Sequence, residues 1–141
     1  MNIAVDFDGT IVEHQYPRIG KEKPFAIATL RQLQAEHHHL ILWTAREGEL
    51  LQQAIDFCSE RGLEFYAING DYADEQPDEP GYSRKLKADL FIDDRNLGGL
   101  PDWRVIYEMI HNRWDYKQYL QYLQDDEPEE KPSFWKRVLG R

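Results

Sequence analysis

Paired acidic side chains near the amino terminus have the residue types and the spacing of a reactive centre. In the segment NIAVDFDGTIV, Asp6 and Asp8 come one residue apart at the end of an apolar run. The run predicts a buried strand, and the Gly9 that follows predicts a tight turn before Thr10. Two carboxylates that leave a buried strand repel each other. The sequence therefore predicts that a cation lies between them.

Two further apolar runs also end in polar side chains. Thr44 and Arg46 follow the run LILW. Asp93 and Asp94 follow the run LFI. Because ligands bind at the carboxyl ends of the strands in open α/β sheets, we expect all these groups to meet in one crevice. Four carboxylates without a cluster of histidine or cysteine suit a hard cation, so Mg²⁺ is the expected metal.

The elements that would position these residues alternate between short apolar strands and helical patterns. This alternation is typical of βαβ units, and it predicts an α/β fold: a three-layer sandwich with a mostly parallel, Rossmann-like sheet. A helix is expected with Pro24 in its first turn, and Ile27, Leu30 and Leu33 follow at helical spacing. The other expected elements are strands over residues 3–7, 40–43, 63–68 and 90–92, and helices over residues 49–61, 103–110 and 116–123.

Length and composition limit the class of protein. The chain has 141 residues, of which 41% are hydrophobic, as in an ordinary soluble domain. Its formal net charge of −9 argues against general nucleic-acid binding but leaves a phosphorylated small molecule open. The single cysteine excludes a disulfide within the chain. No apolar run has membrane-spanning length and no signal-peptide pattern is present, so we expect a cytoplasmic protein.

The end of the chain changes in composition, so we expect one domain over residues 1–123 and a tail over residues 124–141. The stretch DDEPEEKP is charged and broken by proline, which is typical of a solvated linker. The last residues, SFWKRVLGR, combine apolar and basic side chains. We interpret them as a short helix that docks on its own domain or on a second subunit of a homo-oligomer. A basic amphipathic anchor for a membrane surface or a partner is the alternative.

The motifs come in an informative order: D-x-D-G-T, a strand that ends in Thr44, a lysine, and a strand that ends in D-D. From Asn2 to Asn96, this order resembles the haloacid dehalogenase (HAD) superfamily of phosphohydrolases. The resemblance implies a Mg²⁺-dependent phosphomonoesterase that forms an aspartyl-phosphate intermediate on a phosphorylated substrate. It implies that Asp6 is the nucleophile and that Asp8 is the general acid and base. Thr44 would hydrogen-bond a phosphoryl oxygen.

The resemblance also implies the metal ligands. Asp6, the backbone carbonyl of Asp8 and the side chain of Asp93 would hold Mg²⁺. Asp94 would orient a water ligand of the metal or the lysine.

A lysine should stabilise the phosphoryl charge, and Lys85 is the expected residue. Family members with a short K-x-x-A-D-x-x-I-D-D run match it. Lys87 and Arg84 are the alternatives. Eight extended residues from Lys85 to Asp93 would span about 26 Å, so the chain before the last strand must fold back to bring this lysine near the phosphate.

Several residues around the expected crevice are candidates for substrate binding. They are Gly9, Thr10, Arg18, Arg46 and Asn69. The T-x-R arrangement of Thr44 and Arg46 resembles the S/T-x-R of polynucleotide-end phosphatases in the same superfamily, where the arginine helps to hold the phosphorylated group. In the alternative interpretation, Thr44 and Asn69 only satisfy backbone groups at strand ends, and Arg46 pairs with Glu47 on the surface.

The chain has no room for a cap domain. Only residues 11–23 and 69–84 lie where such a domain would be inserted. The sequence therefore resembles a capless member, whose open site could accept a phosphate on a bulky molecule or be covered by a second subunit. His14, Tyr16 and Arg18 are candidates for the mouth of this site, or they are loop residues without such a role.

Two other functions stay open at this point. A phosphoacceptor receiver domain also combines an acidic pocket, Mg²⁺, a threonine and a lysine. Its phosphorylated aspartate follows a middle strand, however, whereas Asp6 would follow the first. A phosphate-binding module that has lost turnover is the other alternative, although binding alone would not need the acid and base Asp8.

Overall fold

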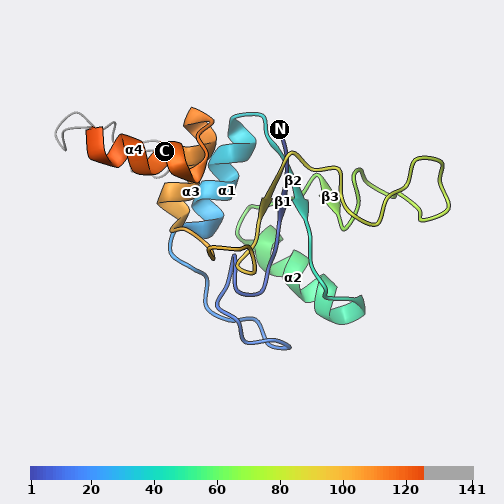
Figure 1. Cartoon of the computed structure of the whole chain (residues 1–141). Helices are drawn as coiled ribbons and strands as arrows, with labels where there is room; N and C mark the ends of the chain where they lie inside the picture. The colour runs from blue at the N-terminus through green and yellow to red at the C-terminus, as the bar shows by residue number, and fades with distance from the viewer. Residues whose placement is uncertain (126–141) are drawn as a thin grey trace. The chain divides into compact units, whose positions relative to one another are not determined.

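The computed structural model describes residues 1–125, and the chain divides into two compact units, Met1–Leu100 and Pro101–Arg141 (Figure 1). The predicted linker and tail lie almost entirely outside the described residues and stay predictions. Within residues 1–125, no helix has the length and apolar character that a membrane crossing requires.

The first unit is built on a sheet of four parallel strands in the order β3-β2-β1-β4. The strands are β1 (Asn2–Val5), β2 (His39–Leu42), β3 (Ala67–Ile68) and β4 (Leu90–Ile92). The first strand is therefore an inner one, and Val5 pairs with both Leu42 and Ile92. This register brings the carboxyl ends of the three strands to one edge of the sheet. The residues that follow them are held next to one another.

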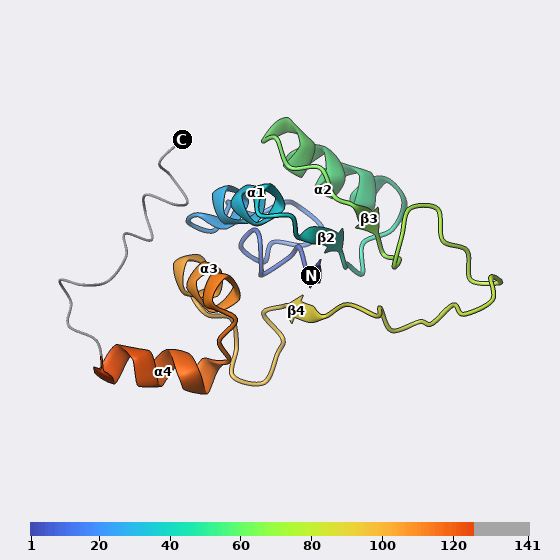
Figure 2. The same ribbon diagram turned by 90° about the horizontal axis from the view of Figure 1, so that it is seen from above.

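Two helices cover one face of this sheet. Helix α1 (Ala26–Ala35) connects β1 to β2, and α2 (Gly48–Glu60) connects β2 to β3. Both connections step in the same direction across a parallel sheet, and right-handed crossovers then place both helices on the same face. Figure 2 shows α1 and α2 on one side of β2 and β3. The strand residues that point to this face, Ile3, Val5, Leu40 and Leu42, are completely buried.

The opposite face of the sheet carries a smaller apolar cluster. Ala4, Ile41 and Ala67 lie in one row across the strands, and Leu86 from the segment before β4 packs with them. Trp43 and Phe91 pack against the same cluster. The long irregular segment between β3 and β4 is thus fastened to the sheet by an apolar anchor.

Neither loop that could hold a cap contains one. The chain after β1 forms a small hairpin, in which Val12 bridges to Glu22 and the Lys23 N–H donates to the Ile11 carbonyl at 2.8 Å. The segment between β3 and β4 has no helix or strand. The predicted α/β class, the parallel sheet and the absence of a cap domain are therefore confirmed.

In the second unit, the described residues form α3 (Trp103–Asn112) and α4 (Tyr116–Asp125). Asp102 caps the first turn of α3, because its carboxylate accepts the Arg104 N–H at 2.8 Å. A left-handed Arg113 ends the same helix. Both helices were predicted, and each extends two residues beyond the predicted end.

Other predicted element boundaries were also wrong. The first strand ends at Val5 rather than at residue 7. The third strand covers only Ala67 and Ile68 rather than residues 63–68. Leu63 belongs to the turn that terminates α2, because its N–H donates to the Cys58 carbonyl at 2.9 Å after the left-handed Gly62. Helix α1 begins at Ala26, after Phe25 in a left-handed conformation, so Pro24 precedes the helix instead of lying in its first turn.

Candidate active site

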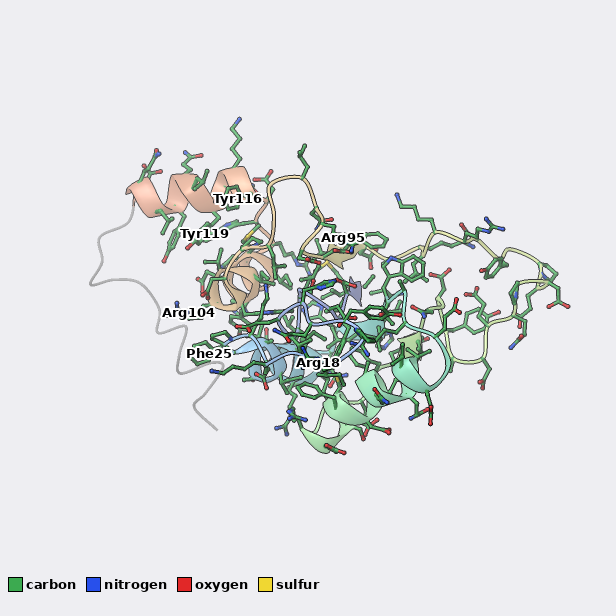
Figure 3. All side chains as sticks on the ribbon, turned by 90° about the horizontal axis from the view of Figure 1, so that it is seen from below. Arg18, Phe25, Arg95, Arg104, Tyr116 and Tyr119 are labelled. Carbon is green, nitrogen blue, oxygen red and sulfur yellow. The ribbon has the colours of Figure 1, made fainter. Side chains whose placement is uncertain are left out.

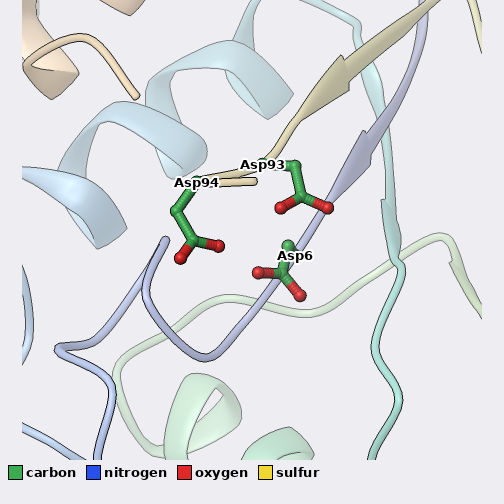
Figure 4. A group of neighbouring side chains, drawn as sticks. All are labelled: Asp6, Asp93 and Asp94. Atoms are coloured by element: carbon green, nitrogen blue, oxygen red, sulfur yellow. The ribbon is translucent and has the colours of Figure 1, made fainter. Parts of the chain in front are cut away.

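Three carboxylates converge at the carboxyl edge of the sheet. Asp6 follows β1, whereas Asp93 and Asp94 follow β4, and one oxygen of each lies within 4.8 Å of the others. The Asp6 N–H donates to the Ile92 carbonyl at 3.0 Å, which continues the pairing of β1 with β4. Figure 4 shows the three side chains turned toward a common space. The parallel register thus explains how residues 87 positions apart come together.

The electrostatics of this cluster favour a bound cation. The pKa of Asp6 is raised from 3.8 to about 7, chiefly by burial and then by the charge of Asp93 and a hydrogen bond with Asp94. The Thr10 hydroxyl and the Phe7 backbone oppose this shift. Clustered carboxylate oxygens without nitrogen or sulfur ligands suit a hard divalent ion. The residues present therefore fit Mg²⁺.

Gly9 and Thr10 shape this cluster from the turn after β1. The Thr10 hydroxyl accepts the Asp94 N–H at 3.0 Å and lies 3.1 Å from an Asp6 oxygen and 3.3 Å from an Asp94 oxygen. Gly9 has a φ of +83°, and a Cβ there would lie 2.3 Å from an Asp94 carboxylate oxygen. The structure places both residues against the carboxylates, and neither lines the adjoining cavity. The expectation that they bind substrate stays a prediction.

Asp8 does not belong to this group of three carboxylates, and its side chain pairs with Arg46. The Arg46 Nε and Nη2 atoms each donate to one Asp8 oxygen at 2.7 Å. The arginine side chain is completely buried, and the aspartate side chain is 12% exposed. This bidentate pair fixes the orientation of the carboxylate. Arg46 therefore pairs with Asp8 in the interior, and not with Glu47 on the surface as in the alternative interpretation.

The remaining donors of Arg46 bind backbone carbonyls. Nη1 donates to the Pro17 and Leu50 carbonyls, and Nη2 also donates to the Arg18 carbonyl. All five N–H donors of the guanidinium are therefore used within the protein. We interpret Arg46 as the residue that positions Asp8, since no donor is left over for the predicted contact with a substrate.

A cavity of about 570 Å³ opens beside these acidic residues. Its lining combines acidic, basic and aromatic side chains from the ends of β1, β2 and β4. The lining residues are Asp6, Asp8, His14, Tyr16, Trp43, Thr44, Ala45, Arg46, Asp93 and Arg95. His14 and Tyr16 therefore lie where the sequence suggested, at the site.

Thr44 lines the cavity, and Asn69 supports it from outside. The Thr44 N–H donates to the Asn69 side-chain oxygen at 2.8 Å, and the Thr44 hydroxyl accepts the Arg46 N–H at 3.1 Å. A hydroxyl that accepts from the backbone keeps its own proton to donate to an anion. Asn69 thus matches the alternative in which it satisfies a backbone group, and it is not one of the lining residues.

The predicted lysine and Arg18 lie outside the cavity lining. The Lys85 ammonium lies 5.8 Å from the centre of the Phe91 ring. Phe91 and Asp93 are two residues apart and so point to the same face of the sheet, which places Lys85 on the face that carries the carboxylates. Lys87 donates instead to the Gly81 carbonyl at 2.5 Å. The Arg18 side chain contacts Gln15 at 3.4 Å.

Three lining residues were not among the predicted site residues: Trp43, Ala45 and Arg95. Trp43 and Ala45 flank the predicted Thr44, and Arg95 follows the predicted Asp94. Arg18 and Arg95 are both labelled in Figure 3, on the loop after β1 and after β4 respectively. The available signal for these lining residues was that each adjoins a motif residue at the end of a strand.

Comparison with known proteins agrees with this geometry. Residues 3–96 match the family of haloacid dehalogenase-like hydrolases, and this range contains all the cavity-lining residues. A solved structure of a conserved protein from Bacteroides thetaiotaomicron is 65% identical, with a TM-score of 0.80. The match covers 84% of this chain and 96% of that one. No curated protein matches the chain significantly. With two thirds of its length matched and an acidic cluster at the carboxyl edge of its sheet, the chain belongs to the haloacid dehalogenase-like hydrolases.

Proposed function

We propose that the protein is a Mg²⁺-dependent phosphomonoesterase that works through an aspartyl-phosphate intermediate. One observation carries this proposal: the Asp6, Asp93 and Asp94 carboxylates lie within 4.8 Å of one another, at a cavity that Asp8 and Thr44 also line. The same cavity thus holds a nucleophile, a separate acid and base, and a hydroxyl donor.

Asp6 would attack the phosphorus atom of the bound monoester. One carboxylate oxygen forms a bond to phosphorus while the bond from phosphorus to the leaving oxygen breaks. A bound Mg²⁺, held by Asp6, Asp93 and the Asp8 carbonyl and supported by Asp94, would neutralise the charges that otherwise oppose this approach. The Thr44 hydroxyl would donate its proton to a phosphoryl oxygen.

Asp8 would move the two protons of the reaction. It gives a proton to the leaving oxygen in the first step and takes one from water in the second. The hydroxide attacks phosphorus, which releases phosphate and restores the Asp6 carboxylate. Each Asp8 oxygen accepts only one bond from Arg46, so each keeps a lone pair for the proton.

The alternatives receive less support from this site. Asp6 follows the first strand of the chain and not a middle one, which disfavours a receiver domain. A module that only binds phosphate would not need Asp8 to be oriented by a completely buried arginine.

Substitution of the two aspartates tests the mechanism. An aryl phosphate with a good leaving group needs little help from an acid, so Asp8→Asn should form the aspartyl-phosphate and then fail to hydrolyse it. We expect labelled, hydroxylamine-sensitive protein in Asp8→Asn and none in Asp6→Asn. Asp56→Asn, on the exposed side of α2, is the matched control and should turn over normally. Turnover in Asp6→Asn, or no Mg²⁺-dependent hydrolysis of any monoester by the native chain, would overturn the proposal.

The phosphate-stabilising cation is proposed to be Lys85, with Lys87, Arg84 and the cavity-lining Arg95 as alternatives. Each is replaced by alanine in turn, and hydrolysis of one aryl phosphate is compared. Loss of a single preorganised charged donor should reduce kcat by about 100-fold or more. A normal rate in Lys85→Ala together with a loss in another variant would reassign the role.

The proposed catalytic domain is residues 1–123, and the tail is proposed to dock rather than to take part in the chemistry. A chain that ends at Gln124 should keep most of its hydrolysis of a small aryl phosphate, although its oligomeric state can change. Loss of turnover in a folded truncated chain with unchanged association would place the tail in the active site.

A further inference from the structure

Two aromatic side chains line the cavity beside the reactive carboxylates. Tyr16 comes from the hairpin after β1, and Trp43 follows the last residue of β2. Tyr16 is 51% exposed, which is unusual for a large ring that belongs to a defined wall. The steps proposed for Asp6, Asp8 and Thr44 use neither ring. Their presence at the site therefore needs a separate explanation.

Both rings are held in place before any ligand arrives. The Tyr16 ring lies 5.2 Å from the guanidinium carbon of Arg46, and the carbonyls of the next two residues, Pro17 and Arg18, accept bonds from the same guanidinium. The Trp43 backbone N–H donates to the Val5 carbonyl at 2.8 Å, and the Trp43 side chain packs against the apolar cluster on the sheet. A ring that is already fixed loses little conformational entropy when it binds a ligand.

We propose that the substrate is a phosphate monoester whose leaving group carries a planar aromatic ring, as nucleoside monophosphates and aryl phosphates do. This inference rests on the phosphatase function proposed above and names its substrate class. The phosphate would lie at Asp6 and Thr44, and the ring would pack on Tyr16 and Trp43. Aromatic rings stack on such side chains with little regard to their polar substituents.

The rest of the cavity supports this substrate class. Apart from the two aromatic residues, the residues assigned to the chemistry and Arg46, its polar side chains are His14 and Arg95, whereas a bare sugar phosphate would need a larger set of hydroxyl-binding groups. The cavity volume of about 570 Å³ lies within the range of small-ligand sites. The net charge of −9 opposes a long polyanion, so a small molecule is the expected carrier of the ring.

The first test compares substrates with and without a ring. The substrates are adenosine 5′-monophosphate, phosphotyrosine and ribose 5-phosphate, each assayed with Mg²⁺. We expect kcat/KM to be at least about 10-fold higher for a ring-bearing substrate than for ribose 5-phosphate, in line with the usual contribution of one stacked ring. A preference for the nucleotide or for phosphotyrosine identifies the source of the ring. Equal or higher kcat/KM for ribose 5-phosphate would overturn the inference.

The second test removes the rings. Tyr16→Leu and Trp43→Leu keep apolar bulk and should lower the ratio of kcat/KM between ring-bearing and ring-free substrates by about 10-fold each, whereas Tyr16→Phe should retain the ratio. Tyr66→Leu is the matched control, because Tyr66 is also exposed but precedes β3 at the other edge of the sheet. If both leucine variants keep the native ratio, the rings serve only to cover Arg46 and the sheet.

A binding measurement separates this inference from the phosphatase proposal. In the Asp6→Asn variant, adenosine 5′-monophosphate or phosphotyrosine should quench tryptophan fluorescence, whereas ribose 5-phosphate should not. The quenching should be lost in the double variant that combines Asp6→Asn with Trp43→Leu. If the ring-bearing ligands bind in this way but the native chain hydrolyses no monoester, the phosphatase proposal is wrong and the ring-binding site stands. If the native chain hydrolyses monoesters but binding does not depend on the ring, the ring-binding site is wrong and the phosphatase proposal stands.

Discussion

Replacement of Arg46 by methionine isolates the role of the buried pair with Asp8. Methionine fills similar space without a charge, so the change removes the donors and leaves the volume. The Asp8 side chain, at 12% exposure, would lose both bonds of 2.7 Å and keep its charge. Three backbone carbonyls, those of Pro17, Arg18 and Leu50, would lose a donor as well.

The expected cost follows from what is left behind. Breaking a buried ion pair by removing one partner typically costs about 3–5 kcal/mol, because the other charge stays buried without compensation. For a chain of this length, that loss lowers Tm by roughly 10 °C or more. Asp8→Asn combined with Arg46→Met removes the orphaned charge, and the double variant should recover about 1 kcal/mol or more of the free energy of unfolding.

Urea unfolding of the four members of this double-mutant cycle measures these terms. The exposed Asp102–Arg104 pair is a matched control, since its Nε–Oδ1 distance is also short, at 2.9 Å, but both side chains are 43% exposed. Arg104→Met should change the urea midpoint little, because solvent screens exposed pairs. The hydrolysis rate should fall in Arg46→Met and in Arg46→Lys, since neither side chain can hold both Asp8 oxygens.

A urea midpoint for Arg46→Met equal to that of Arg104→Met would refute the expected cost of breaking the buried pair. An Arg46→Lys variant that hydrolyses substrate at the native rate would refute the role of Arg46 in positioning Asp8, because lysine keeps the charge and loses only the planar guanidinium. The two readouts therefore separate the charge of Arg46 from its geometry.

Three further outcomes are expected. Because the pKa of Asp6 is raised to about 7, the free energy of unfolding of the metal-free protein should fall as pH rises between 3.8 and about 7. The rise in Tm on addition of Mg²⁺ should grow over the same range, and calorimetry at several pH values checks both. Gly9→Ala should lose stability and also weaken Mg²⁺ binding by displacing Asp94, whereas Gly48→Ala, with a φ of +55° and no atom within 4 Å, should only lose stability. Thr44→Val should reduce kcat/KM by about 10-fold or more without affecting Mg²⁺ binding, as seen in steady-state kinetics and titration.

The sheet and its acidic edge could be predicted because they depend on local patterns. Apolar runs that end in Asp6, Thr44 or Asp93 mark the carboxyl ends of parallel strands, and parallel strands of one sheet end at the same edge. The length of the third strand could not be predicted, because an apolar Leu63 is compatible with a strand and with the end of α2. Only the hydrogen bond to the Cys58 carbonyl decides between them.

The pairing of Asp8 with Arg46 could not be predicted for a different reason. The two residues are 38 positions apart. The sequence motifs suggested a different role for each, namely proton transfer for Asp8 and substrate binding for Arg46. Which partner a buried arginine selects depends on the course of the loop after β1. That course is itself set by backbone hydrogen bonds that leave no pattern in the residue types.

The position of Lys85 shows where the fold and the chemistry meet. The chain before β4 does turn back, as the site requires, since Leu86 joins the apolar cluster on the sheet and holds the neighbouring lysine beside Phe91. Phe91 shares its face of the sheet with Asp93, so this ammonium lies on the face that carries the carboxylates, although outside the cavity lining. An anion at Asp6 and Thr44 would attract this cation, which otherwise rests on an aromatic face. Leu86 thus holds Lys85 on the face of the sheet that carries Asp93, whereas Arg95 lines the cavity itself. The comparison of their alanine variants would show which of the two cations stabilises the phosphate.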